Sequence, residues 1–174
     1  MHCAHAANRR PRSNPTAFGA ARPGKSARAP KSLKASAIGH LARREYSRAE
    51  LRAKLVATGA TRDEVDVVLD EIAALGYLSD TRFAKALVGQ KSGAMSKRSI
   101  SASLKAKGVD ADVASAALAA SDVDDQDAMV ALWLRKFGTP PANDREKARQ
   151  VRFLQSRGFA LSAIFKLLRD PPSD

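Results

Sequence analysis

The sequence predicts an all-α protein built from three tandem three-helix repeats. Gly59, Gly108 and Gly158 return at intervals of 49 and 50 residues, and each follows a leucine by four residues. A period near fifty residues is typical of stacked units that bury their apolar faces against one another. Aromatic residues make up only 5% of the chain, so alanine, leucine and valine must fill the core. These residues suit closely packed helices better than a sheet.

Residues 1–34 differ in composition from the rest of the chain. They consist mainly of Ala, Arg, Pro, Ser and Gly, with eight basic residues and no acid, and they hold two thirds of the net charge of +12. Such a segment buries too little apolar surface to offset the entropy of ordering. We expect a disordered basic arm that adds salt-sensitive affinity for nucleic acid, the alternative being a solvated tail without a specific function.

Repeat 1 is assigned to residues 35–82. After a first helix, two more are expected to begin at pairs with the S/T-x-x-E spacing of a capping box, Ser47 with Glu50 and Thr61 with Glu64. The recurring glycine between these pairs is expected to adopt a left-handed conformation and to close the middle helix.

Repeat 2 is assigned to residues 83–122. Ser96 is expected to cap its middle helix, Gly108 to close that helix, and Asp110 to cap the last one.

Repeat 3 is assigned to residues 123–174. An acidic connector around Asp124 and Asp125 leads into it, and these carboxylates either cap the next helix or repel a polyanion. Asn143 with Glu146 is expected to start a longer middle helix, and closing prolines end the chain.

Basic residues recur around the middle helix of every repeat. Stacked repeats align equivalent faces, so these residues form either one continuous basic track for a partner or nucleic acid, or three ordinary solvated faces. The candidate binding residues are Arg43, Arg44, Arg52 and Lys54 in repeat 1, Lys97, Arg98, Lys105 and Lys107 in repeat 2, and Arg145, Lys147, Arg149, Arg152 and Arg157 in repeat 3.

The sequence offers no catalytic centre, cofactor or metal site that we would nominate. Gly19, Gly24, Lys25 and Ser26 match the phosphate-loop pattern, but neither the preceding strand nor the following helix that this loop needs is predicted. The single cysteine, Cys3, permits no internal disulfide. We expect a cytoplasmic protein that is not an enzyme; a mitochondrial transit peptide is the less favoured reading of the Arg-rich start.

Four segments that follow one another along the chain resemble the RecX family of bacterial recombination regulators. They are residues 41–55, 76–88, 105–113 and 149–164. The resemblance covers all three repeats. It departs from the usual pattern at Ala60, where a larger apolar residue is expected, at Ala160, where a capping Ser is expected, and in the length of the arm. The matching residues include Arg44, Glu45, Ser47, Glu50, Leu51, Lys54, Leu55, Asp80, Arg82, Phe83, Ala84, Phe153, Leu154, Arg157, Gly158 and Phe159.

The resemblance implies an elongated, curved array that lodges in the groove of the RecA filament on single-stranded DNA. Proteins of this family inhibit the recombinase, ATPase and co-protease activities of RecA and have no catalytic centre of their own. We expect a monomer in which Arg82 and Phe83 help to set the angle between repeats.

Two other functions remain open at this point. Three-helix units can contain a helix-turn-helix, so a sequence-specific DNA-binding regulator is the main alternative, although no single helix stands out as a reader of bases. A helical adaptor for an unrelated acidic protein is the other.

Overall fold

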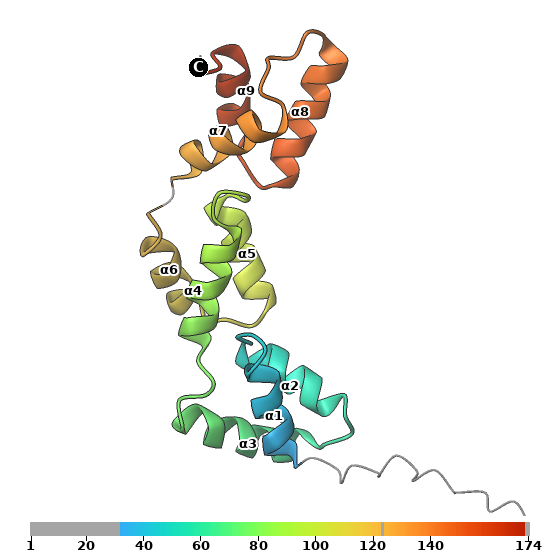
Figure 1. Cartoon of the computed structure of the whole chain (residues 1–174), viewed down its shortest axis with the longest axis vertical. Coiled ribbons are helices and arrows are strands. Elements are labelled where there is room, and N and C mark those ends of the chain that lie inside the picture. Colours follow the sequence, from blue (N-terminus) through green and yellow to red (C-terminus); the bar gives the residue numbers. More distant parts are fainter. Residues whose placement is uncertain (1–31, 123, 173–174) are drawn as a thin grey trace, which may run out of the picture. The chain divides into compact units, whose positions relative to one another are not determined.

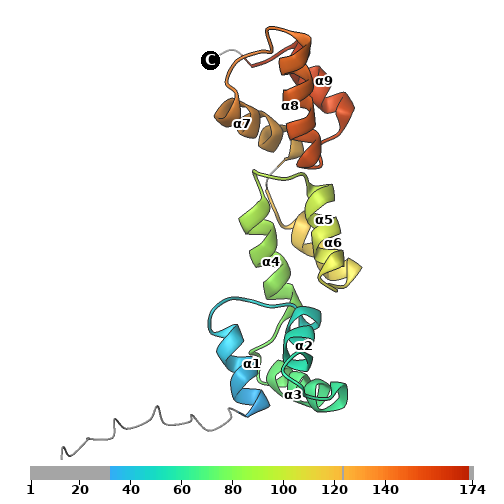
Figure 2. The ribbon, with the colours of Figure 1, turned by 90° about the vertical axis from the view of Figure 1, so that its right-hand side faces the viewer.

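The computed structural model describes residues 32–122 and 124–172, and this part of the chain consists of nine α-helices without a strand (Figure 1). The triplets α1–α3, α4–α6 and α7–α9 form separate groups in both ribbon views (Figures 1 and 2). The prediction of an all-α chain of tandem three-helix repeats is confirmed. The helices are α1 (Leu33–Leu41), α2 (Arg48–Val56), α3 (Arg62–Ala74), α4 (Asp80–Lys91), α5 (Lys97–Ala106), α6 (Ala111–Ala119), α7 (Asp125–Lys136), α8 (Asp144–Ser156) and α9 (Leu161–Arg169).

Each repeat buries a hydrophobic core of its own. Leu51, Leu55 and Leu69 belong to the core of repeat 1, Ile100 belongs to that of repeat 2, and Trp133 belongs to that of repeat 3. Apolar burial is the main favourable term in folding, so it stabilises each triplet separately. The connections between repeats therefore depend more on polar contacts and close backbone approach than on a shared core.

The recurring glycines have the predicted left-handed conformation, with φ angles of 97° at Gly59, 72° at Gly108 and 89° at Gly158. Two of them also lie where the chain has no room for a side chain. A Cβ atom on Gly108 would lie 2.5 Å from the Cβ of Ala49, and one on Gly158 would lie 2.6 Å from the Oγ of Ser96. Gly59 belongs to the first described repeat, so no repeat precedes it within the described residues. A Cβ atom added to Gly59 would have no other atom within 4 Å.

The capping residues confirm most of the predicted helix starts. Thr61 and Glu64 form the reciprocal capping box, and Ser96 and Asp110 cap α5 and α6. Asp124 accepts a hydrogen bond from the backbone N–H of Gln126 at 2.7 Å, so the acidic connector does cap a helix.

Two predicted capping boxes are only half formed. Ser47 and Asn143 accept the hydrogen bonds expected of N-caps, but the side chains of Glu50 and Glu146 do not return to them. The Glu146 carboxylate accepts from the N–H of Ala142 at 2.9 Å instead, one residue before the N-cap. The Glu50 carboxylate pairs with basic side chains described below.

Two helix starts lie close to expected boundaries. Helix α1 begins at Leu33, where Ser32 caps it, while residues 1–31, which hold most of the expected arm and the phosphate-loop match, lie outside the described part. Helix α4 begins at Asp80 because Ser79 accepts a hydrogen bond from the N–H of Arg82 at 3.3 Å. The boundary expected between residues 82 and 83 therefore falls inside α4, and repeat 2 begins near Ser79.

The last helix begins without a side-chain cap, as the alanine at position 160 predicts. In the described part of the chain, we find no helix with the length and apolar character needed to span a membrane.

Candidate protein and nucleic-acid interface

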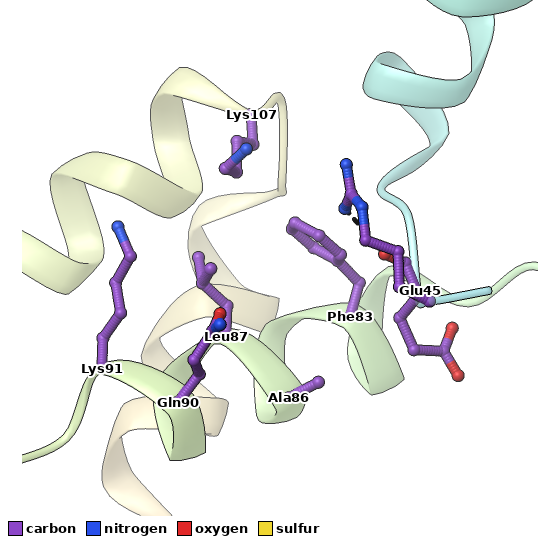
Figure 3. A pocket seen from close by; sticks show the side chains of 8 residues that line it. Glu45, Phe83, Ala86, Leu87, Gln90, Lys91 and Lys107 are labelled. Carbon is purple, nitrogen blue, oxygen red and sulfur yellow. Dashed lines mark hydrogen bonds between the residues drawn. The ribbon is translucent and has the colours of Figure 1, made fainter. Parts of the chain in front are cut away.

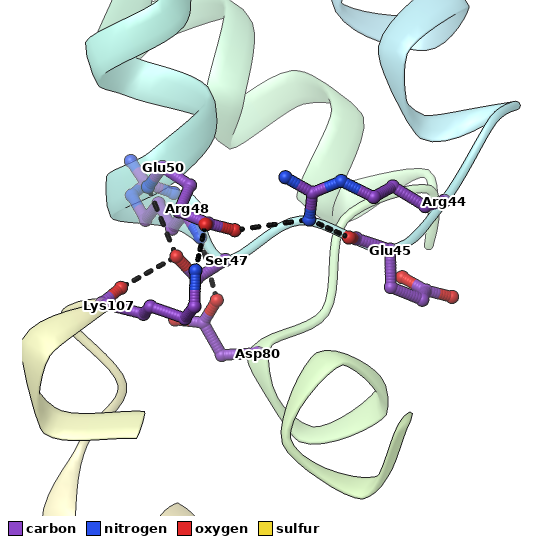
Figure 4. Close-up of polar contacts among 7 residues, drawn as sticks. All are labelled: Arg44, Glu45, Ser47, Arg48, Glu50, Asp80 and Lys107. Carbon is purple, nitrogen blue, oxygen red and sulfur yellow. Dashed lines mark hydrogen bonds and ion pairs between the residues drawn. The ribbon is translucent and has the colours of Figure 1, made fainter. Parts of the chain in front are cut away.

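A buried serine joins repeat 1 to repeat 2. The hydroxyl of Ser47, which caps α2, donates a hydrogen bond of 2.6 Å to the backbone carbonyl of Lys107 in the loop after α5 (Figure 4). In the other direction, the carboxylate of Asp80 at the start of α4 accepts from the backbone N–H of Arg48 at 2.7 Å. We call this pair of contacts the first joint.

The second joint, between repeats 2 and 3, uses the same arrangement. Ser96, which caps α5, donates through its hydroxyl to the carbonyl of Gly158 at 2.8 Å and through its N–H to the carbonyl of Arg157 at 3.0 Å. Asp125 at the start of α7 accepts from the N–H of Lys97 at 2.7 Å. In both joints, therefore, the N-terminus of the middle helix of one repeat contacts the glycine loop that ends the middle helix of the following repeat.

The sequence predicts these serines as caps alone and indicates no partner for the two aspartates across the joints. One signal was available, because Ser47 and Ser96 are 49 residues apart, the interval that separates the first two recurring glycines. The repeat period therefore marks both sides of each joint.

An ion-pair cluster adds to the first joint. The Glu50 carboxylate accepts a hydrogen bond from the Lys107 ammonium and lies 3.4 Å from the Arg44 guanidinium (Figure 4). Burial alone would raise the pKa of Glu50, but the hydrogen bonds and charges of Lys107 and Arg44 outweigh it and hold this pKa below its ordinary value. We call these three residues the Glu50 clasp. At the second joint the residue 49 positions later is Ser99, which has no charge.

Arg44 and Arg82 tie the segment before α2 to its surroundings. The Arg44 guanidinium lies 3.6 Å from the ring centroid of Tyr46, a cation–π contact, and donates to the carbonyl of Glu45. Arg82 on α4 donates to the Glu45 carboxylate at 3.0 Å and to the carbonyl of Tyr77 at 2.8 Å. Arg82 therefore bridges α4 to repeat 1.

Phe83, the second residue expected to help set the angle between repeats, lies in the hydrophobic core of repeat 2. It also lines a hollow at the first joint that is described below.

The basic residues of repeat 1 are largely neutralised. Arg48 pairs with Asp70 at 2.6 Å, and Arg52 pairs with Asp66 at 2.5 Å. Both acids belong to α3, which carries five acidic residues and one basic residue. Arg44 is held in the Glu50 clasp, while Arg43 and Lys54 are exposed. A continuous basic track over all three repeats is therefore weakest at repeat 1.

The candidate cations on α5, on α8 and at Arg157, which directly follows α8, differ from those of repeat 1 in their ion pairing. Within residues 32–122 and 124–172 no ion pair involves any of the following candidates: Lys97, Arg98, Lys105, Arg145, Lys147, Arg149, Arg152 and Arg157. The segment 144–157 has five basic residues and two acids. In the described part of the chain, positive charge without a carboxylate partner is therefore concentrated in repeats 2 and 3.

The packing of α8 directs its cations outward. Gln150 and Leu154 are buried, and the Gln150 amide oxygen accepts a hydrogen bond of 2.7 Å from the Trp133 indole. Residues at i, i+4 and i+7 share a helix face, so Arg145, Arg149 and Arg152 lie along one exposed face of this helix.

Aromatic rings accompany the basic residues of repeat 3. The Arg149 guanidinium lies 5.5 Å from the Phe137 ring centroid, and the Lys147 ammonium lies 6.0 Å from that of Phe165. Phe165 is 43% exposed. Cations beside exposed aromatic rings are typical of surfaces that bind single-stranded nucleic acid, where bases stack on the rings.

The described residues contain no group of three or more His, Cys, Asp or Glu side chains arranged to hold a metal ion. His40 lies edge-on to the Tyr46 ring with a centroid distance of 5.8 Å. Burial, followed by the charges of Lys54 and Arg43, lowers the pKa of His40. The pair is a packing contact.

Comparisons with known proteins cover all three repeats. Residues 34–71, 79–118 and 122–168 match the family models for the first, second and third three-helix domains of RecX. A protein named regulatory protein RecX from Ralstonia pickettii is 38% identical over 141 residues, 81% of this chain and 89% of the relative. One from Leptothrix cholodnii is 41% identical over 138 residues, 79% of this chain and 88% of the relative. The crystal structure of RecX from Lactobacillus salivarius has the same fold, with a TM-score of 0.61 at 18% identity, over 79% of this chain and 93% of that one.

Proposed function

We propose, on the premise that this chain belongs to the RecX family of regulatory proteins, that it binds the RecA filament on single-stranded DNA and inhibits its activities. The inhibited activities are recombination, ATP hydrolysis and co-protease function. In this proposal the chain acts as a monomer in the cytoplasm and has no catalytic activity of its own.

The observation that carries this proposal is the set of cations on α5 and α8 that have no carboxylate partner within the described residues. A polyanionic filament attracts such cations over long range. The charges of Arg48 and Arg52 on α2 are instead partly neutralised by their ion pairs with aspartates of α3. We therefore assign the main contact with DNA phosphates to Arg145, Arg149 and Arg152.

The remaining candidates have supporting parts in this proposal. Those of α5, with Lys147 and Arg157, extend the contact, whereas Arg43 and Lys54 add a weaker one from repeat 1. The joints keep the three repeats in register, so the cations of successive repeats engage the filament together. Arg82 and Phe83 support that register, and residues 1–31 add salt-sensitive affinity for DNA.

The test is the single-stranded-DNA-dependent ATPase of the cognate RecA, titrated with this protein below equimolar ratio. We expect inhibition at substoichiometric amounts by the natural chain and its loss in the double variant Arg149→Glu/Arg152→Glu. The matched control, Arg62→Glu/Lys85→Glu, changes the net charge equally at two exposed positions on α3 and α4.

Inhibition that survives the α8 change at physiological salt would show that these arginines are not the contact. If the natural chain leaves the ATPase unaffected but protects a defined duplex sequence, the chain is a DNA-binding regulator and the proposal is wrong.

A further inference from the structure

A hollow lies at the first joint (Figure 3), and two residues of the Glu50 clasp, Arg44 and Lys107, line it. Its volume is about 500 Å³, room for one or two amino-acid side chains rather than a folded domain. Its wall is formed by one face of α4 together with Arg44, Glu45 and Lys107.

Positive charge dominates the rim of this hollow. Arg44, Lys91 and Lys107 line it, against a single acid, Glu45, that already binds Arg82. The Lys91 ammonium donates to the Ser103 hydroxyl at 3.1 Å and, among the described residues, forms no ion pair.

The wall beneath the rim is apolar. Phe83 and Leu87 are largely buried but contribute to the surface of the hollow (Figure 3). The Lys107 ammonium lies 6.0 Å from the Phe83 ring centroid. A ligand that carries a carboxylate next to an apolar group would therefore match both surfaces.

The Glu50 clasp shows how this rim binds a carboxylate. A single carboxylate lies between Lys107 and Arg44, and it engages one hydrogen of the Lys107 ammonium. An ammonium group has three donors, so Lys107 can donate to a second carboxylate that approaches from the side of the hollow.

We propose that this hollow binds a short acidic segment of a protein partner, with a carboxylate on Lys91 and Lys107 and an apolar side chain against Leu87 and Phe83. Where that partner is RecA, the inference rests on the function proposed above. It assigns the contact with protein to the first joint and leaves the contact with DNA to α5 and α8.

The same surroundings disfavour nucleic acid as the occupant. The Glu45 carboxylate binds Arg82, and the Glu50 carboxylate lies between Lys107 and Arg44, so a run of consecutive phosphates passing the joint would meet both negative charges, whereas a single carboxylate placed on Lys91 need not. Nucleic acid is bound by grooves that follow several consecutive phosphates, whereas this site is a compact hollow between two repeats.

The probe is a short fluorescein-labelled peptide of Glu and Leu residues, titrated with the full chain at physiological salt and followed by fluorescence anisotropy. We expect Lys91→Glu to weaken binding about tenfold, because it replaces an attraction with a repulsion. Lys85→Glu is the matched control, since it reverses an exposed charge on the same helix outside the hollow and should leave the affinity unchanged. Gln90→Glu adds a carboxylate to the wall without removing the hydrogen bond of Lys91, and we expect it to weaken binding as well.

Equal weakening by the Lys85 and Lys91 substitutions would overturn the inference, because binding would then depend on net charge alone. It would also be overturned if exchanging Leu for Ser in the peptide had no effect, or if Lys91→Glu weakened an oligothymidylate more than the peptide. If Lys91→Glu abolishes peptide binding but leaves inhibition of RecA intact, the assignment of the RecA contact to the first joint is wrong, while the proposed function stands. Specific peptide binding by a chain that does not inhibit RecA would support the hollow and reject the proposed function.

Discussion

Replacing Gly108 by alanine should destabilise the first joint, and Gly59→Ala provides a control within the same chain. Both glycines have positive φ angles, so alanine costs about 1–2 kcal/mol of backbone strain at either position. Only at position 108 does the new Cβ meet another atom, the Ala49 Cβ at 2.5 Å. Overpacking of this kind costs about 1–3 kcal/mol more. The φ of Gly59 lies farther from the ordinary left-handed region, so the strain there is no smaller and the comparison is conservative.

The assay is urea unfolding of the full chain, together with hydrogen exchange at the Arg48 amide, which donates to Asp80 across the joint. We expect Gly108→Ala to lose more stability than Gly59→Ala and to expose the Arg48 amide. Adding Ala49→Gly removes the atom that clashes, so the double variant should regain the overpacking cost. Equal losses at the two glycines, or no coupling between positions 49 and 108, would refute the close-approach argument.

Three further perturbations follow from the structure. Ser96→Ala removes both an N-cap and the hydroxyl that binds Gly158, so we expect thermal unfolding to show a loss of about 1–2 kcal/mol, larger than for Asn143→Ala, which removes only a cap. The lowered pKa of Glu50 means that the clasp contributes its full stability above the unfolded pKa of about 4.3 and loses it as the pH falls through the lower folded value; Glu50→Gln should flatten the unfolding free energy in that range. Ala160→Ser supplies the missing cap of α9 and should stabilise repeat 3 by about 1 kcal/mol in urea unfolding.

Each of these predictions has an outcome that contradicts it. Equal losses for the Ser96 and Asn143 variants would show that the hydroxyl adds nothing across the joint. An unchanged pH dependence in the Glu50 variant would assign the acid sensitivity to other carboxylates. No gain from the serine at position 160 would mean that the first turn of α9 is already satisfied by solvent.

Local chemistry explains why the sequence predicts the helices well. The start at Thr61 and the left-handed glycines depend on residues a few positions apart, so their signals are complete within a short window. The predicted box at Ser47 is only half formed because Glu50 has a stronger partner in Lys107, which is 57 residues away. A cap prediction cannot weigh such a competitor.

The charge distribution is harder to predict because pairing is a tertiary property. A count of basic residues predicts a basic face in repeat 1 as well as in repeat 3, yet Arg48 and Arg52 are paired with Asp70 and Asp66. The two arginines are four residues apart on α2, and the two aspartates are four residues apart on α3. This spacing places the arginines on one face of α2 and the aspartates on one face of α3. This match between neighbouring helices is a signal that a count of charges does not use.

The two joints bind through the main chain of four basic residues. Lys107 and Arg157 contribute carbonyl oxygens, and Arg48 and Lys97 contribute amide hydrogens, so these main-chain bonds set no requirement on the side chains of Arg48, Lys97 and Arg157, whereas the Lys107 side chain also binds Glu50. Mutation can exchange those three side chains while the serine, the aspartate and the glycine keep the repeats assembled. The regions where adjacent repeats meet can therefore diversify in recognition without loss of architecture, in the way that antibody loops vary on a constant framework.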